Sequence, residues 1–452
     1  MQQESLLDFI KSKYTLNEEQ SNVLDCVNLK RNIFLTGSAG TGKSRVVGAL
    51  KELLRDNLAV TATTGVAALN IEGITFHSYT GLGLMKMPWK QTVEKLSKNE
   101  EIKKRLLSIT TLLIDEISMF SSKELVFLNH LLKSIKKTTR SFGGLQIILV
   151  GDFLQLPYVD KEDGTDHSGI EKSPLFLHNI WKELDLKVCY LSKIIRQSNQ
   201  EDIKILNEIR VGEFSSKFYN SYLAPNKITS SQFNSCDNII TITDTNQKAN
   251  DINSEKYNKL KGQEYIYTWE ILQGTESLVR GKYRSTFERV KDILKLKVGA
   301  EIIVDYNINQ QLGLVNGTRG RVIKFTNGMP TIQYSKNSEI LEHTFYPHEF
   351  KEWQWNHSTN SQECVVNVKQ LPISLSYAIT VNRSQGLSFT ESILDLNDYS
   401  KFHKGKIYTA ISRCTDLSKV YYLSFPSRLK QSNGKYFNVD EDALSLLNSF
   451  KN

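Results

Sequence analysis

The fold of this chain is decided by the stretch Ile33-Phe34-Leu35-Thr36-Gly37-Ser38-Ala39-Gly40-Thr41-Gly42-Lys43-Ser44. A short apolar run leads into a glycine-rich loop, and residues 45–56 follow with apolar side chains at helical spacing. Glycines let the backbone curl so that its N–H groups point inward, and the positive end of a helix adds attraction for anions. The order of strand, glycine loop and helix therefore predicts a P-loop that binds nucleotide phosphates. The alternative, an ordinary glycine-rich turn, does not require these flanks.

Two motifs supply the groups that phosphate chemistry needs. We expect Lys43 to reach the β- and γ-phosphates of ATP and the Ser44 hydroxyl to ligate Mg²⁺. Further along, the apolar run 111–114 leads directly into Asp115 and Glu116, which is typical of a Walker B motif. Asp115 is predicted to hold Mg²⁺ through water, and Glu116 to accept a proton from the attacking water.

A third apolar run, residues 146–150, is followed by Gly151-Asp152-Phe153-Leu154-Gln155-Leu156-Pro157. In a parallel sheet, ligand groups gather at the carboxyl ends of the strands. Gln155 is therefore expected to face the same nucleotide, where it would orient water or sense the γ-phosphate. Gln20 is a further candidate, because an amide can read an adenine edge, although its position after Asn17 equally suits a helix capping box.

Composition narrows the class of protein. The composition, 40% hydrophobic and 23% charged residues, is typical of proteins with globular cores. A length of 452 residues suggests about three domains. The net charge of +8 suits a polyanionic partner but equally suits a solvated surface. The five cysteines are scattered along the sequence, so we expect neither a zinc ribbon nor a disulfide framework. Without a visible targeting or membrane-spanning segment, we expect a soluble intracellular protein that does not act at a membrane.

Polar and aromatic side chains cluster after the predicted strand at 58–63. Thr64 opens a short helix, and Thr75-Phe76-His77-Ser78 places hydroxyls and aromatic rings together, as a groove for single-stranded nucleic acid requires. Residues 79–101 follow as an insertion, predicted to be a loose loop or to carry a strand-separating tip at Met85, Met87 or Trp89. The alternative for His77 alone is a structural or solvated histidine.

The second half of the chain repeats a strand–helix pattern without a P-loop of its own. Ser198 and Glu201 predict a capping box for a helix that ends at Arg210. Short strands punctuated by glycines predict a small β-barrel between residues 294 and 372. Trp353 and Trp355 are expected in its core, and the alternative for them is a platform on which bases stack. Near residue 410, an apolar helical stripe leaves Arg413 off the packing face, free to point into a cleft.

The ordered set of motifs resembles superfamily 1 DNA helicases, most closely the Pif family, with RecD and the phage Dda helicase as more distant relatives. The matching stretches are LNEEQ (16–20), GSAGTGKS (37–44), TATTGVAALNIEGITFHS (61–78), LLIDEISM (112–119), GDFLQLP (151–157), IIRQ (194–197), GLVNGTRG (313–320), ITVNRSQG (379–386) and YTAISR (408–413). They run in family order over nearly the whole chain, and GDFLQLP and DEISM are the pieces that discriminate the family.

This resemblance implies an α/β fold with two RecA-like P-loop NTPase domains built on parallel sheets. Residues 1–78 and 102–187 would form the first domain, and residues 188–293 and 373–452 the second. The insertion at 79–101 would carry the wedge, and the β-barrel at 294–372 would flank the DNA. The implied activity is ATP-dependent 5′-to-3′ translocation on single-stranded DNA, with Mg²⁺ and ATP and with unwinding of duplexes that carry a 5′ tail.

The resemblance also implies roles for individual residues. Arg196 and Arg413 would be arginine fingers on the γ-phosphate and would act with Glu116 and Gln155 in catalysis. The nucleotide would be held by Gln20, Gly37, Ser38, Ala39, Gly40, Thr41, Gly42, Lys43, Ser44 and Asp115, with Ser44 and Asp115 serving Mg²⁺. The DNA track would comprise Thr64, Thr75, Phe76, His77, Ser78, Asn382, Arg383, Ser384, Gln385 and Gly386.

One departure from the family pattern lies at Asn382-Arg383, where relatives usually carry His-Lys. Asn still forms hydrogen bonds and Arg still binds phosphate, so we expect DNA binding to survive with an altered grip. The resemblance further implies a monomer, with partners in replication, repair or recombination. The alternatives are a P-loop ATPase acting on protein or RNA, a DNA-stimulated ATPase that needs a partner to separate strands, and a nucleotide-gated module that holds DNA without moving.

Overall fold

The computed structural model describes residues 5–82, 88–158, 173–193, 199–236, 239–283, 287, 289–309, 311–336, 339–356, 361–397, 400, 402–426 and 435–450. The chain divides into two compact units. The first unit comprises residues 1–161, 167–233 and 384–452, and the second comprises residues 162–166 and 234–383. These units do not follow the predicted domain boundaries, because residues 188–233 and 384–452 group with the P-loop part of the chain.

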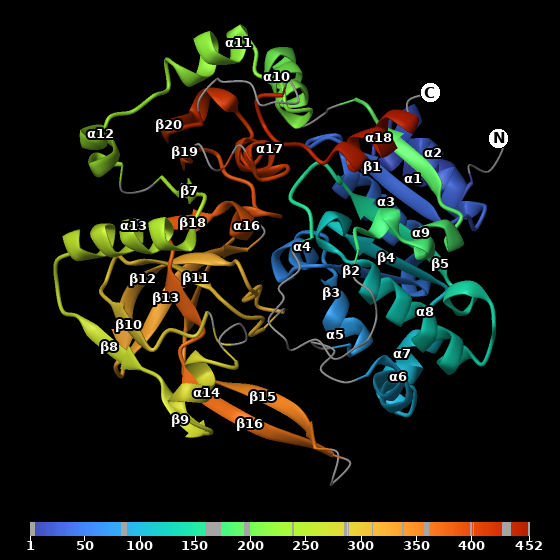
Figure 1. The fold of residues 1–452 in the computed structure, drawn as a ribbon, viewed down its shortest axis with the longest axis horizontal. Coiled ribbons are helices and arrows are strands. Elements are labelled where there is room, and N and C mark those ends of the chain that lie inside the picture. The colour runs from blue at the N-terminus through green and yellow to red at the C-terminus, as the bar shows by residue number, and fades with distance from the viewer. Residues whose placement is uncertain are drawn as a thin grey trace. The chain divides into compact units, whose positions relative to one another are not determined.

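The first unit is built on a six-stranded parallel sheet (Figure 1). Its strand order is β3 (Ile74–Thr75), β2 (Leu58–Ala62), β4 (Thr111–Asp115), β5 (Gln146–Gly151), β1 (Ile33–Gly37) and β6 (Lys187–Leu191). The α/β class with a parallel sheet is thereby confirmed. Strand β6 corrects one expectation: it was assigned to the second domain, but it pairs with β1, with Val188 opposite Phe34.

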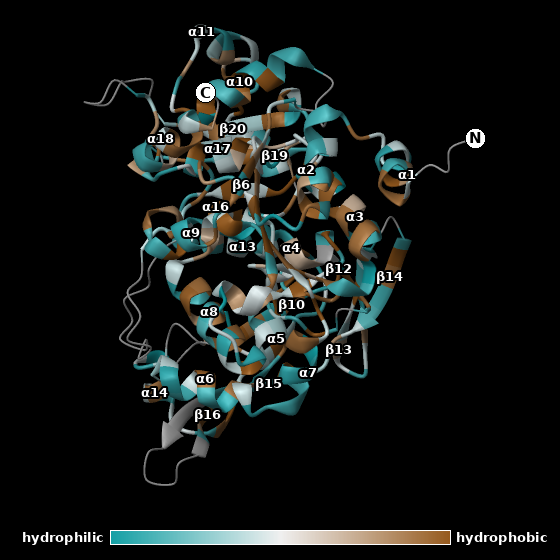
Figure 2. Cartoon of the chain, turned by 90° about the vertical axis from the view of Figure 1, so that its right-hand side faces the viewer, coloured by the Kyte–Doolittle hydropathy of each residue, from teal (hydrophilic) through white to brown (hydrophobic). Residues whose placement is uncertain are grey.

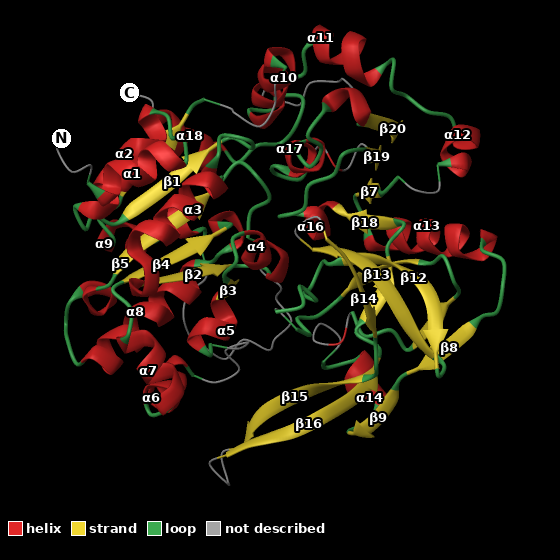
Figure 3. Cartoon of the chain, turned by 180° about the vertical axis from the view of Figure 1, so that it is seen from behind, coloured by secondary structure: helices red, strands yellow, loops and turns green. Residues whose placement is uncertain are grey.

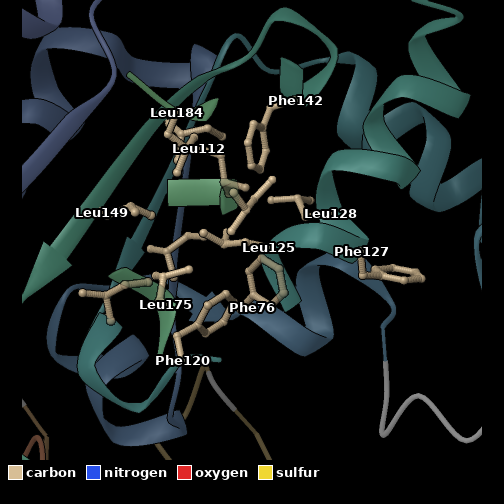
Figure 4. Close-up of a cluster of buried hydrophobic side chains, with 14 of the residues drawn as sticks. Phe76, Leu112, Phe120, Leu125, Phe127, Leu128, Phe142, Leu149, Leu175 and Leu184 are labelled. Carbon is tan, nitrogen blue, oxygen red and sulfur yellow. The ribbon is translucent and has the colours of Figure 1, made fainter. Parts of the chain in front are cut away.

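Both faces of this sheet are buried. Along β1, Ile33 and Leu35 belong to one hydrophobic cluster and Phe34 to another, because successive side chains point to opposite faces. The first cluster packs against helices α1, α2 and α3, and the second against α5, α8 and α9 (Figure 1). Figure 4 shows the second cluster, where Phe76, Phe120 and Leu125 converge beneath the strands. A parallel sheet covered on both faces accounts for strands that read as continuous apolar runs.

The helices of the first unit include those that the sequence predicted after the P-loop, after Thr64 and up to Arg210. Figure 2 shows teal and brown residues together on several of them, as amphipathic packing requires. They are α1 (Leu6–Lys13), α2 (Glu18–Asn28), α3 (Lys43–Leu54), α4 (Gly65–Asn70), α5 (Phe76–Thr80), α6 (Trp89–Ser97), α7 (Glu100–Leu107), α8 (Ser122–Lys136), α9 (Asn179–Glu183), α10 (Gln200–Arg210), α11 (Ser216–Phe218), α17 (Lys406–Ile411) and α18 (Glu441–Ser449).

The cap of one helix differs from prediction, and one apolar residue at a helix end is exposed. Helix α10 is capped by Asn199, whose side chain accepts the Glu201 N–H, whereas a box opening at Ser198 was expected. Ser198 itself lies outside the described residues. Leu29 follows the end of α2 and is 70% exposed.

The insertion at 79–101 is largely helical rather than a loose loop, since α6 and the start of α7 fall within it. Trp89 begins α6, and its ring stacks on His130 of α8 with centroids 4.2 Å apart. Trp89 is therefore packed against the core and does not form a projecting tip. Met85 and Met87 lie outside the described residues.

The last helix, α18, also belongs to the P-loop core. Ala443 and Leu447 are buried in the same cluster as Phe34, and the Phe450 ring lies 6.1 Å from that of Phe34. Residues 373–452 were expected in the second domain, whereas residues 384–452 group with the P-loop residues. Strands β19 (Ser392–Asp395) and β20 (Val420–Ser424) form a parallel pair in the same unit.

The second unit is rich in antiparallel strands (Figure 3). A five-stranded sheet has the order β14, β13, β12, β11, β17, and a three-stranded sheet has the order β15, β16, β9. These antiparallel sheets agree with the predicted β insertion, and β8 begins well before residue 294, where that insertion was expected to start. The strands are β7 (Thr241–Thr243), β8 (Tyr265–Thr268), β9 (Glu270–Gln273), β10 (Ile293–Leu296), β11 (Glu301–Val304), β12 (Arg319–Thr326), β13 (Met329–Lys336), β14 (Glu339–Thr344), β15 (His348–Asn356), β16 (Ser361–Gln370), β17 (Ile373–Leu375) and β18 (Ala378–Thr380).

Helices α13 (Asn246–Lys259) and α14 (Glu276–Arg280) lie in the second unit, and α16 (Val381–Ser384) ends where the first unit resumes. Trp353 and Trp355 were predicted to lie in the barrel core, but their side chains are not among those that the structure describes. Among the described residues, no helix is long and apolar enough to cross a bilayer.

The core around α8 gives a stability prediction. Leu128→Ala removes a fully buried side chain from the cluster in Figure 4, so we expect a loss of about 2–5 kcal/mol in unfolding free energy. Leu29→Ala is the matched control, because Leu29 is 70% exposed and its truncation should stay within about 0.5 kcal/mol. Thermal melting of both variants measures the difference, and equal melting temperatures would contradict this packing.

Candidate nucleotide-binding site

The P-loop joins the end of β1 to the start of α3. Gly40 and Gly42 have φ of 83° and 87°, in the left-handed region that glycine tolerates, and Gly42 caps α3. The Lys43 ammonium donates to the carbonyl oxygens of Gly37 at 2.8 Å and Ser38 at 3.1 Å. The loop is thus curled around the lysine that was predicted to meet the phosphates. Ser44 lies exposed in the first turn of α3.

Two carboxylates stand at the carboxyl end of β4. Removal from water and the neighbouring Glu116 raise the pKa of Asp115 to about 7, while the Glu116 N–H donates to Asp115 at 2.8 Å. Glu116 adopts φ 56°, a left-handed conformation that is uncommon outside glycine and recurs at functional sites. Burial lowers the pKa of Lys43, and Asp152, Glu116 and Asp115 oppose that shift.

These groups fit a divalent cation. A cation between the two neighbouring carboxylates and the phosphates would reduce the repulsion between their negative charges. The exposed Ser44 hydroxyl adds a neutral oxygen ligand. Among the described residues, no cluster of three or more His, Cys, Asp or Glu side chains forms a metal cage. Mg²⁺ sites built from one or two carboxylates and substrate phosphates need no such cage.

Gln20 supports the loop from α2. Its amide Nε2 donates to the Thr41 carbonyl at 3.1 Å, and its Oε1 accepts the Asn17 N–H at 3.2 Å. The capping box is therefore confirmed. The carbonyl of this buried amide is engaged by the cap, so in this structure Gln20 holds the P-loop rather than presenting a free edge to a base.

The loop after β5 carries a buried ion pair. Asp152 accepts from Arg210 Nε at 3.0 Å and from its Nη2 at 2.8 Å, and it also accepts the Leu154 N–H at 3.1 Å. Both charged side chains are almost fully buried. Although burial opposes it, Arg210 holds the pKa of Asp152 below its usual value. Such a two-pronged pair fixes the end of α10 to this loop.

Helix α17 covers the same loop. Thr409 Oγ1 accepts the Leu156 N–H at 3.2 Å, and the Tyr408 hydroxyl lies 3.4 Å from Asp152 Oδ2. Gly405, which caps α17 with φ 67°, approaches so closely that a Cβ would lie 2.6 Å from the Leu154 carbonyl oxygen. Residues 405–409 therefore pack against residues 152–156, and the contact at Gly405 leaves no room for a side chain.

Arg413 and Gln155 meet as a result of this docking. Arg413 Nη2 lies 3.5 Å from Gln155 Oε1, and its Nε donates to the Thr409 carbonyl at 2.9 Å. Arg413 is only 6% exposed, which corrects the expectation that it points freely from the packing face. Arg196, the other predicted finger, lies outside the described residues.

Comparison with known proteins places this arrangement in a family. The family model described as PIF1-like helicase matches residues 15–220, and that of the DNA helicase Pif1 2B domain matches residues 289–325. The chain is 31% identical over 431 residues to the ATP-dependent DNA helicase PIF1 of Danio rerio, covering 92% of this chain and 62% of that protein. This chain belongs to the PIF1-like helicase family. The ATP-dependent DNA helicase Pif1 of Psychrobacter sp. (strain PRwf-1) is 30% identical over 88% of this chain and 66% of that relative.

Solved Pif1 structures share the fold along almost the whole chain. The Pif1 helicase from Candida albicans superposes with a TM-score of 0.80 at 26% identity, covering 96% of this chain and 99% of that one. Pif1 from Bacteroides in complex with ADP-AlF3 and ssDNA gives a TM-score of 0.75 at 26% identity, covering 96% and 97%. The chain spans slightly less than two thirds of the length of the first two curated relatives.

The predicted DNA contacts of the Pif1-like first half separate into two groups. Phe76 is fully buried, with its ring edge-on to Phe120 at 4.7 Å, so it packs in the core and cannot stack on a base. Ser78 is exposed, and its hydroxyl accepts from Thr75 at 2.7 Å. His77 is half-buried, and burial lowers its pKa. Thr64 caps α4 by accepting the Ala67 N–H.

The predicted contacts at 382–386 also separate. Asn382 is exposed, whereas Arg383 forms an ion pair with the buried Asp305 in the second unit. In the first unit, Ser384 and Gln385 are buried, and Gln385 Nε2 donates to the Ser118 hydroxyl at 3.2 Å. Gly386 accepts a hydrogen bond from the Asn70 side chain at 2.7 Å. Those two contacts link this motif to the segments that follow β4 and β2.

Sequence reasoning missed the roles of Asp152, Arg210 and Tyr408. Asp152 and Tyr408 lie inside quoted motifs, but their chemistry emerges only when helices distant in sequence meet the end of β5. A buried Asp within a strand-end motif is the signal that could have prompted a search for a cationic partner. Buried neighbours Cys26 and Cys189 were likewise unpredicted, and burial together with Cys26 raises the pKa of Cys189 to about 12.

The docking of α17 gives a prediction. Gly405→Ala adds both left-handed strain and a collision with loop carbonyls, so we expect it to lower the unfolding free energy by about 3 kcal/mol. Gly328→Ala is matched in φ at 74° but has no atom within 4 Å of its Cβ, so it should cost only about 1 kcal/mol. Thermal melting compares the two, and an equal cost would show that Gly405 is not tightly packed.

Proposed function

We propose that this chain is an ATP-dependent DNA helicase that moves 5′ to 3′ along single-stranded DNA and opens duplex ahead of it. The observation that carries the proposal is the meeting of Arg413 with Gln155 beside the P-loop and Walker B carboxylates. The named relatives are ATP-dependent DNA helicases, and one solved relative is a complex with ADP-AlF3 and ssDNA, which supports the same chemistry here.

The chain's residues can be given roles in hydrolysis. The P-loop N–H groups and Lys43 would bind the β- and γ-phosphates, and Glu116 would take the proton of the attacking water. Gln155 would orient that water, while the Arg413 guanidinium, already hydrogen-bonded to Gln155, would stabilise charge that develops on the γ-phosphate. Mg²⁺, held by Ser44 and Asp115, would neutralise phosphate charge when bound.

Translocation requires that nucleotide state changes the grip on DNA. Gln385 contacts Ser118, which follows the Walker B carboxylates at the end of β4, and Gly386 contacts Asn70 at the end of α4. These contacts offer a route from the nucleotide site to the predicted DNA track. Because the track would bind backbone rather than bases, we expect movement to be largely independent of sequence. A monomer is proposed as the acting form, with replication, repair or recombination partners as further proposals.

The first test is Lys43→Ala. Loss of the ammonium removes the phosphate contact, so ATP turnover should fall below detection while some single-stranded DNA binding persists. Lys261→Ala, an exposed lysine of the second unit, is the charge-matched control and should retain turnover. Phosphate release measures turnover, and fluorescence anisotropy measures DNA binding. Wild-type turnover in Lys43→Ala would refute the P-loop assignment.

The second test is polarity. Matched duplexes with either a 5′ or a 3′ single-stranded tail are incubated with ATP and Mg²⁺, and strand release is measured. We expect release from the 5′-tailed duplex alone. Release from the 3′-tailed duplex would contradict the proposed direction. DNA-stimulated hydrolysis without release from either would favour the alternative, a translocase that requires a partner to separate strands, and stimulation by RNA but not DNA would favour an RNA substrate.

A further inference from the structure

A chain of hydrogen bonds runs from the P-loop to α10 through a single tyrosine. The Ala39 N–H donates to the Tyr408 hydroxyl at 2.8 Å, and that hydroxyl lies 3.4 Å from Asp152 Oδ2. Asp152 in turn accepts both prongs of Arg210. All three side chains are almost completely buried, so water does not compete for these bonds.

The protonation states of Tyr408 and Asp152 determine which group donates in each hydrogen bond. A phenol has one proton to donate and lone pairs to accept with. Burial and the nearby Asp152 raise the pKa of Tyr408, so the hydroxyl keeps its proton. Asp152, ionised beside Arg210, can only accept. The proton of Tyr408 therefore points to Asp152, and its lone pair receives the Ala39 N–H.

The position of Tyr408 gives this bond a consequence. Ala39 lies within the glycine loop whose backbone is expected to cradle phosphates, while Tyr408 lies on α17, just before Arg413. Arg413 bonds back to Thr409, the residue next to Tyr408, and reaches Gln155. Tyr408 thus ties the loop that binds phosphate to the helix that carries the arginine.

We propose that Tyr408 is a positioning residue that fixes Arg413 relative to the P-loop through the Ala39 N–H, and so sets the rate of ATP turnover rather than nucleotide affinity. This inference rests on the proposed function. Nucleotide affinity comes from the phosphate contacts of the P-loop backbone and Lys43, and α17 supplies none of these contacts. The rate depends on the placement of Arg413, and misplacement of a catalytic group by about 1 Å can cost about 10²-fold.

The test is Tyr408→Phe in the full chain. Phe keeps the ring packing and removes only the hydroxyl. We expect kcat for DNA-stimulated ATP hydrolysis to fall by about tenfold or more, with KM for ATP and Kd for ADP changed by less than about twofold. Tyr346→Phe, at a side chain that is 64% exposed, is the matched control and should leave both parameters unchanged. The melting temperature of each variant verifies that it is folded.

A double-mutant cycle separates positioning from a merely structural role. If Tyr408 acts through Arg413, adding Tyr408→Phe to Arg413→Ala should lower kcat no further, whereas independent effects would multiply. Multiplied effects, an unchanged kcat, or a rise in the ADP Kd that matches the fall in kcat would each overturn the inference while leaving the helicase proposal standing. Absence of ATP turnover in the wild-type chain, with ADP still bound, would overturn both.

If Tyr408→Phe does not fold, amide hydrogen exchange in the wild-type chain tests the hydrogen bond between Ala39 and Tyr408 instead. Slow exchange of the Ala39 amide, compared with the amide of exposed Ser44, is the expected result for an N–H bonded to a buried hydroxyl. Exchange at Ala39 as fast as at Ser44 would overturn the proposed link.

Discussion

The ion pair between Asp152 and Arg210 is the constraint on which the nucleotide site depends. A buried carboxylate without a partner is strongly unfavourable, so Asp152 requires α10 to stay docked at the end of β5. With that carboxylate held ionised and oriented, Tyr408 has an acceptor for its proton and the P-loop has an acceptor for the Ala39 N–H. One charge at a strand end therefore organises groups drawn from three distant segments of the chain.

The parallel sheet makes this convergence possible. Because β1, β4 and β5 run in the same direction, the glycine loop, the paired carboxylates and the GDFLQLP loop all leave the same edge. The strands themselves are committed to packing, with alternate residues of β1 buried in opposite clusters. Chemistry is confined to the loops at their ends, where backbone conformations such as those of Gly42 and Glu116 depart from regular structure.

Local features of this protein were predictable from sequence, and long-range ones were not. The Asn17–Gln20 capping box, the strand before Gly37 and the helix that follows the P-loop are determined by neighbouring residues, and the structure confirms each. The resemblance to the helicase family predicted that Gln155 and Arg413 act at the same site. Nothing local indicates that Trp89 packs on His130 or that Arg413 is buried, because both depend on which helices cover which face. The ion pair of Asp152 with Arg210 is of the same kind.

Helix α18 has a consequence for how the protein is made. A chain emerges from the ribosome with its N-terminal residues first, and domains generally fold as units during synthesis. Here the core around Phe34 of β1 includes Ala443 and Leu447, which are translated some four hundred residues later. The P-loop sheet therefore cannot bury its apolar face fully until residues 441–450 have emerged. Until then, a nascent chain exposes the apolar surface around Phe34 that α18 later covers.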